Sequence, residues 1–175
     1  MEKTIEVSVR EVDMKNYEKR IITEVCPEFL LKASCISTPI NGVKNETIYY
    51  SYENYIPLKE YDCSLNIVFL ILNKYVDCLI AARNILLNTE NISSDVDKIF
   101  ITEKMELRLV YGSSTVRNDI DKVCQIATHF SNRHDVVGAK SSMEMLKDKI
   151  SDKNLGLKGC KKLIEVVQRE WNHIN

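Results

Sequence analysis

The sequence predicts an α+β protein in which strands and one helix come first, a long apolar helix follows, and further helices complete the chain. Three observations support this class. Apolar and polar residues alternate near the N-terminus, an apolar helical pattern covers residues 65–87, and only helical periodicity follows residue 112. A length of 175 residues is about one domain. We therefore expect a single domain over residues 1–175, with a small β-rich lobe at 1–58 and a mostly helical lobe at 59–175.

The first elements are a strand and a short helix. Apolar and polar residues alternate through residues 4–9 (TIEVSV), which predicts a half-buried strand. Asp13 or Asn16 can then cap a helix that ends near Val25, just before Pro27. The apolar face expected for this helix consists of Tyr17, Ile21, Ile22 and Val25.

A hairpin follows. Residues 29–36 have the composition of a strand, and residues 48–52 are predicted to be its return strand. Between them lies Asn41-Gly42, a strong turn signal because both residues accept positive φ. This spacing predicts one hairpin with a connection somewhat longer than the tightest turn, and Pro57 is then expected to end the strand ladder.

Tyrosines crowd the end of this hairpin and the linker after it. Aromatic rings can stack on bases or sugars, but no Arg or Lys residues are interleaved here, and aromatic residues are common in strands. Tyrosine is also enriched at the centres of protein interfaces. The candidate interaction patch is Tyr49, Tyr50, Tyr52 and Tyr55.

The central helix is predicted to start after a cap at Asp62 or Ser64 and to be apolar on all but a narrow face, so other elements should cover most of it. A polar turn and two short strands at residues 99–101 and 107–110 come next.

Three helices are expected beyond residue 112, at residues 115–130, 136–150 and 157–174. His129 and His134 are five residues apart, which is the wrong spacing for a pair of metal ligands on one helix, so surface or cap positions are expected.

Composition excludes several classes of protein. Hydrophobic residues make up 45% and charged residues 28%, which is typical of a globular chain. The net charge is −1 with both signs mixed along the chain, which argues against nucleic-acid binding. The six cysteines form no CxxC pair, so we expect reduced core thiols and no zinc site.

The N-terminus lacks a signal-peptide pattern, and the longest apolar run, residues 67–72, is far shorter than the roughly 20 residues that span a bilayer. We therefore expect a cytoplasmic protein without a transmembrane segment.

The order of these elements resembles a shortened protein-kinase fold. In such a fold the hairpin and the first helix belong to the small lobe, and residues 56–62 form the hinge. The helix after Ser64 is the central helix of the large lobe. Residues 91–101 (NISSDVDKIFI) then take the place of the catalytic loop HRDxxxxN, and residues 109–112 (LVYG) take that of the metal-binding DFG turn.

Two groups of proteins share this shortened pattern. One is an uncharacterised bacterial domain family found ahead of forkhead-associated domains in Gram-positive proteins. The other is the cytosolic pseudokinase-like domain of the membrane subunit of type VII secretion systems. The runs that resemble the first family are PEFLLKASCIS, PINGVKNETIYYSY, LNKYVDCLIAARNILLN and DKIFITEKMELRLVYG. The resemblance covers residues 17–112.

The resemblance implies that the catalytic set is missing. Phosphoryl transfer in kinases uses an Asp near the acceptor hydroxyl, an Asn and an Asp on magnesium, and a Lys on the phosphates. Here Ser93 falls at the base position, Lys98 at the Asn position and Val110 at the DFG aspartate. No glycine lies between residues 1 and 40, so the Gly-rich loop is absent too. Asp95 and Asp97 are nearby carboxylates, for which a turn-capping role is the simpler interpretation.

Other enzyme templates are also absent. The chain contains no GxSxG, no GxxxxGK[ST] and no HExxH, and a pairing of Cys124 or Cys78 with His129 is one that any cysteine-rich chain offers. We predict a non-enzymatic interaction or scaffold module with no cofactor and no metal. Its partners are unidentified proteins, and self-association remains open. The alternative is a degenerate nucleotide-binding domain or residual enzyme that keeps the cleft between the two lobes and uses Lys32 or Lys44 for a phosphate.

Overall fold

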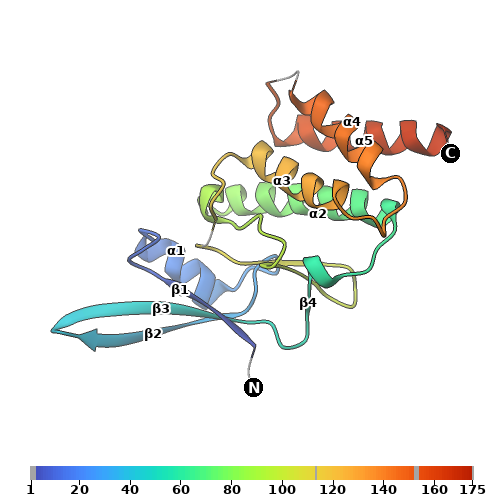
Figure 1. Ribbon diagram of the computed structural model, residues 1–175. Helices are drawn as coiled ribbons and strands as arrows, with labels where there is room; N and C mark the ends of the chain where they lie inside the picture. The colour runs from blue at the N-terminus through green and yellow to red at the C-terminus, as the bar shows by residue number, and fades with distance from the viewer. Residues whose placement is uncertain (1–2, 113, 152–153, 175) are drawn as a thin grey trace.

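The computed structural model describes residues 3–112, 114–151 and 154–174. A three-stranded sheet lies at one end of the molecule and helices α2 to α5 lie at the other, with a second small sheet between them (Figure 1). The α+β class and the predicted order of strands, long central helix, short hairpin and C-terminal helices are confirmed. The likeness of this order to a shortened kinase-like fold stays a prediction from the sequence.

The first sheet is fully antiparallel and has the order β1-β3-β2. Its strands are β1 Thr4–Ser8, β2 Ala33–Ile40 and β3 Val43–Ser51. One face carries Val7, Ile48 and Tyr50 into the core, while the alternate residues face solvent. The β2–β3 hairpin projects away from the helices (Figure 1).

The hairpin is tighter and longer than expected. Ile40 pairs with Val43 directly across Asn41 and Gly42, whose φ values of +50° and +77° suit a two-residue hairpin turn. The return strand therefore starts at residue 43 instead of 48, and the first strand covers residues 33–40 instead of 29–36. The added residues 43–47 are polar or exposed on both faces, so hydrophobic alternation could not reveal them.

The first helix buries a different face from the expected one. Helix α1, Asn16–Arg20, continues as a π-helical turn, Ile21–Val25, and buries Glu18 and Ile22. Tyr17 and Val25, predicted as inward residues, are 51% and 67% exposed. A buried glutamate has no signature in hydrophobic periodicity, so the predicted face was displaced by one residue.

A second antiparallel sheet has the order β4-β5-β6 and consists of β4 Ile56–Pro57, β5 Ile99–Ile101 and β6 Leu107–Leu109. Pro57 was expected to end a ladder, yet it pairs with Phe100. Strand β4 is only two residues long and lies at the edge of this sheet, where a proline is tolerated. The division into lobes at residues 58 and 59 stays a prediction.

Helix α2, Leu65–Asn84, is the central element and packs against α3 and α5. It follows Ser64 as predicted and ends three residues early, because the chain turns away with Leu86 at φ +63°. By length and mean hydropathy (1.7) this helix could cross a membrane, but 56% of the window is buried by the rest of the molecule. The core helix of a globular fold has the same properties.

Helices α3 Asp119–Ser131, α4 Ala139–Ser151 and α5 Leu157–Ile174 complete the chain. Helix α3 starts later than predicted because the Asn118 side chain accepts hydrogen bonds from the N–H groups of Ile120 and Asp121. Single 3₁₀ turns occur at Leu58–Glu60 and Thr89–Asn91.

Candidate functional site

The positions that the sequence resemblance assigns to the kinase base and metal-binding aspartate are buried and paired through their backbones. Ser93 and Val110 are both fully buried, and Ser93 N–H donates to Val110 O at 3.0 Å. The Tyr75 hydroxyl donates to Ser93 O at 3.0 Å. Neither position can therefore present a side chain to a substrate or a magnesium ion.

The two nearby carboxylates stabilise a turn. Asp95 accepts a hydrogen bond from the backbone N–H of Asp97 at 3.1 Å, and Asp97 forms an exposed ion pair with Lys59 at 3.2 Å. These contacts agree with the turn-capping interpretation. Among the described residues, no group of three or more His, Cys, Asp or Glu is arranged to hold a metal ion.

A buried polar network lies where α1 meets the segment after β6. The Tyr111 hydroxyl donates to Glu18 Oε1 at 2.5 Å, and the backbone N–H of Lys15 donates to Glu18 Oε2 at 2.8 Å. The Tyr50 hydroxyl donates to Tyr111 O at 2.9 Å. Glu18 is 2% exposed, so these hydrogen bonds replace the water that its carboxyl group would lose on burial.

Burial keeps both phenols protonated. Loss of solvent raises the pKa of Tyr50 and of Tyr111 well above the ordinary value, and the adjacent Glu18 raises that of Tyr111 further. Both hydroxyls therefore act as hydrogen-bond donors throughout the physiological pH range. They connect α1, β3 and the LVYG segment in one network.

Gly112 closes the same junction by direct contact. Its φ is +94°, and a Cβ at this position would lie 2.8 Å from the Val7 side chain and 3.3 Å from that of Met14. Its N–H donates to Asn91 O at 2.7 Å. The backbone at Gly112 thus packs on β1 and the loop after it, leaving no space for a further side chain.

A second buried polar network joins α2, α3 and the 3₁₀ turn Thr89–Asn91 between α2 and β5. Arg83 pairs with Asp119 Oδ2 at 2.6 Å, and the Thr89 hydroxyl donates to the same oxygen at 2.9 Å. Lys122 is fully buried, and its ammonium group donates to Thr89 O. Loss of solvent lowers the pKa of Lys122 to about 8.

The thiols and His129 are not arranged as a nucleophile and base. Burial raises the pKa of Cys78 to about 12 and also raises that of Cys124, which opposes thiolate formation. Burial also lowers the pKa of His129, whose buried Nε2 has no hydrogen-bond partner. The described cysteines are free thiols, and Cys63 and Cys160 are buried.

Three of the four tyrosines of the predicted patch are partly exposed, and the fourth is buried. Tyr50 lies in the core, so its inclusion was wrong: neighbours along a strand point to opposite faces, and β3 directs Tyr49 outward and Tyr50 inward. Tyr52 packs on Phe100 with ring centroids 4.6 Å apart, and Tyr55 borders a hollow beside β6. Tyr49, Tyr52 and Tyr55 remain partly exposed.

The two lysines suggested for a phosphate lie in separate places. Lys32 borders a hollow of about 550 Å³ on the outer face of the first sheet, together with Tyr49 and Ile36. Lys44 pairs with Glu46 at 2.9 Å on the hairpin. The lining of this hollow includes none of the positions that correspond to kinase motifs.

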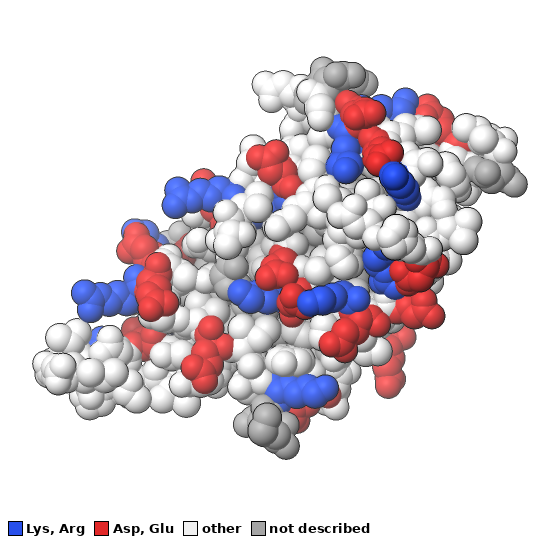
Figure 2. All heavy atoms as spheres, viewed as in Figure 1, with Lys and Arg blue, Asp and Glu red and all other residues white. Residues whose placement is uncertain are grey.

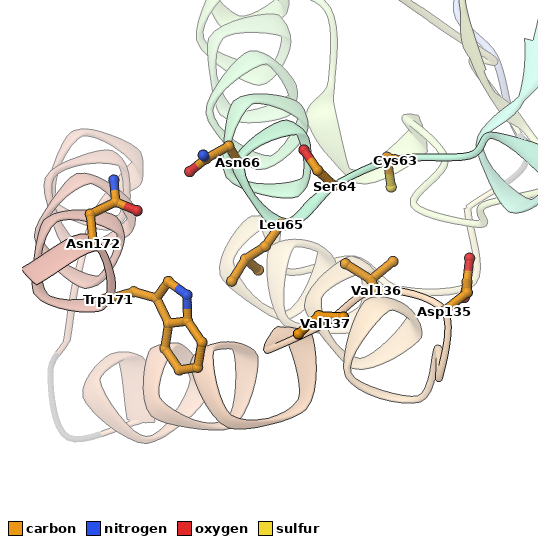
Figure 3. A pocket seen from close by; sticks show the side chains of 9 residues that line it. All are labelled: Cys63, Ser64, Leu65, Asn66, Asp135, Val136, Val137, Trp171 and Asn172. Carbon is orange, nitrogen blue, oxygen red and sulfur yellow. The ribbon is translucent and has the colours of Figure 1, made fainter. Parts of the chain in front are cut away.

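A further hollow of about 430 Å³ lies at the N-terminus of α2 (Figure 3). Ser64, Leu65 and Asn66 approach it from α2, while Trp171 approaches from α5 and Val137 from the segment before α4. Its lining is mostly apolar. Sequence patterns did not predict this hollow, because its residues come from three distant segments.

The face of the molecule seen in Figure 2 carries interspersed acidic and basic side chains with no broad field of one sign. This distribution fits the net charge of −1 and offers no basic track for a phosphate backbone.

No protein-family profile matches the chain, and no curated protein matches it. One solved structure is described as a divergent kinase that lacks the glycine-rich loop and regulates membrane ultrastructure of the Toxoplasma parasitophorous vacuole. It matches over 95% of this chain and 76% of its own, with 14% identity and a TM-score of 0.47. A match this weak carries no argument about fold or activity, and the resemblance to the bacterial family found ahead of forkhead-associated domains stays a prediction.

Proposed function

We propose that this protein is a non-catalytic module that acts by binding other proteins, in a bacterial signalling or secretion-linked assembly of the cytoplasm. One observation carries the proposal. The junction where a kinase would place its metal-binding turn is filled by Tyr111, Glu18 and Gly112 of the chain itself.

Nucleotide binding tests the non-catalytic part of this proposal. Isothermal titration calorimetry with ATP and GTP, with and without Mg²⁺ or Mn²⁺, should give no binding heat at millimolar nucleotide. The physical reason is that Ser93 and Val110 are fully buried and supply no metal ligand. Micromolar binding that is lost on mutation of Lys32 or Lys44 would instead support the nucleotide-binding alternative.

The candidate contact surface is the set of partly exposed tyrosines, Tyr49, Tyr52 and Tyr55. Tyrosine contributes a large contact area at a small entropic cost, which is why it is common at interface centres. Tyr52 packs on Phe100 and is a poor site for mutation, so Tyr49 and Tyr55 are the residues to replace.

A pull-down compares the wild-type chain with Tyr49→Ala/Tyr55→Ala. Tyr17→Ala is the matched control, because Tyr17 is 51% exposed on α1 and lies outside the patch. We expect the double variant to lose specific partners that Tyr17→Ala retains. Identical partner recovery from all three proteins would argue against this surface.

A further inference from the structure

Strand β2 forms an open edge of the first sheet, since the order is β1-β3-β2. Backbone groups of an antiparallel strand point alternately to its two sides. Glu46 O accepts from Val9 N–H on the β1 side, and Ser37 is the β2 partner of Glu46. The backbone groups of Ser37 therefore point away from β3, and by alternation so do those of Cys35 and Ala33. These groups form an unpaired edge.

This edge lacks the usual protection against pairing. Natural edge strands carry charges or bulges or are very short, whereas β2 is eight residues long and contains no charged residue. Ile36 and Ile40 are 49% and 56% exposed, and every residue from 36 to 40 is exposed. Pro39 is the only protective residue. The free end of the hairpin is mostly uncharged on the face seen in Figure 2.

We propose that two copies of this chain pair through β2, antiparallel and about a two-fold axis at Ile36. In this register Cys35 of one copy faces Ser37 of the other, and both residues exchange backbone hydrogen bonds. Ile36 then lies opposite Ile36 of the second copy, in the closer type of cross-strand pair. The two sheets join into one sheet of twice the width.

Neighbouring registers are less favourable. Pro39, which has no N–H, faces Ala33 near the ends of the ladder when the axis is at Ile36. An axis at Ser37 would move Pro39 inward, opposite Cys35, and leave fewer complete hydrogen-bonded pairs. An axis at Cys35 would keep the backbone pairing but move Ile36 opposite Ser34 and lose the contact between the two isoleucines. The axis at Ile36 combines backbone pairing with that contact.

A second copy fits this edge better than an unrelated strand for two reasons. The strand is neutral, so two copies bring no like charges together, and its central residue is an isoleucine that can pair with itself. The hairpin also projects away from the helices (Figure 1), so the helical parts of the two copies would lie at opposite ends of the paired strands.

Sedimentation velocity over a concentration series tests the proposal. We expect the wild type to dimerise in the micromolar range, and Ile36→Lys to weaken the dimer by about tenfold or more, because two lysines would face each other across the axis. Ser37→Pro should also weaken it, because it removes an N–H that faces the open edge and leaves the ladder to β3 intact. Val43→Lys, an equally exposed position on β3, is the matched control and should dimerise like the wild type.

A wild type that stays monomeric throughout the series would overturn the proposal and leave the edge to a strand of another protein. Equal dimerisation of the wild type and Ile36→Lys would overturn it as well. Oxidative cross-linking fixes the register: Ile36→Cys in a Cys35→Ser background should cross-link through residue 36, as identified by peptide mass spectrometry. Efficient cross-linking of wild-type Cys35 to itself would contradict the axis at Ile36.

Discussion

Replacing Tyr111 with Phe should destabilise the protein more than loss of an ordinary buried hydroxyl. The Tyr111 hydroxyl donates to Glu18 Oε1 at 2.5 Å and lies 3.5 Å from Asn91 Nδ2. In Tyr111→Phe the carboxyl group of Glu18 stays buried and keeps only the N–H of Lys15 as a donor. A hydrogen bond to a charged group contributes roughly 1.5–3 kcal/mol, so we expect a loss of about 2 kcal/mol.

Urea and thermal denaturation measure this loss. For a domain of this size a change of 1 kcal/mol shifts Tm by about 2–4 °C, so Tm should fall by about 4–8 °C. The matched control is Tyr50→Phe, which removes a buried hydroxyl that donates to the neutral carbonyl of Tyr111 and should cost about 1 kcal/mol.

Two results would refute this reasoning. One is a loss of stability in Tyr111→Phe that is no larger than in Tyr50→Phe. It would mean that the hydrogen bond to Glu18 contributes no more than a hydrogen bond to a neutral carbonyl. The other is an unchanged free energy of unfolding in Tyr111→Phe, in which Lys15 N–H is the only remaining donor to Glu18. That result would show that water replaces the hydroxyl. A double-mutant cycle with Glu18→Gln isolates the pairwise energy.

Three further predictions concern other buried positions. Gly112→Ala should cost about 2 kcal/mol or more in urea denaturation, because positive φ and a tight contact both oppose a Cβ. Gly42→Ala is the control, because Gly42 also has a positive φ but lies in open space, and it should cost less. Equal losses of stability in the two variants would show that the contact between residue 112 and Val7 contributes nothing. The pKa of Lys122 is lowered from 10.5 to about 8, so the unfolded chain binds more protons and stability should rise between about pH 8 and 10.5. Lys122→Met should flatten that rise, and an unchanged urea midpoint profile would contradict it. Cys78 and Cys160, whose pKa values burial raises to about 12, should react with a thiol reagent at pH 8 far more slowly in the folded protein than in urea.

Sequence patterns identified the elements that depend on local signals. The apolar run after Ser64 predicted the central helix, and Asn41-Gly42 predicted the hairpin turn, because each pattern depends on residues within a few positions. Strand lengths were less predictable. Residues 43–47 pair because the tight turn aligns them, and no hydrophobic pattern marks them.

The candidate site was less predictable because its contacts join distant parts of the chain. Glu18 and Tyr111 are 93 positions apart, and neither residue is unusual in its local sequence. A glutamate on a short helix is ordinarily assigned to the solvent face, so only its partner reveals that it is buried. The burial of Tyr50 is different, since the alternation of a strand already places it on the opposite face from Tyr49.

The connection between the two ends of the molecule has a mechanical consequence. The sequence resemblance predicts that residues 56–62 take the place of the kinase hinge, which lets two lobes open and close around the nucleotide. Here Ile56 and Pro57 are paired with β5, Leu58 is fully buried, and the N–H of Lys59 donates to Val96 O at 3.2 Å. A connector held by a sheet on one side and by core packing on the other resists bending. The hairpin and the helices therefore keep a fixed spacing, and whatever binds at one end is held at a set distance and angle from whatever binds at the other.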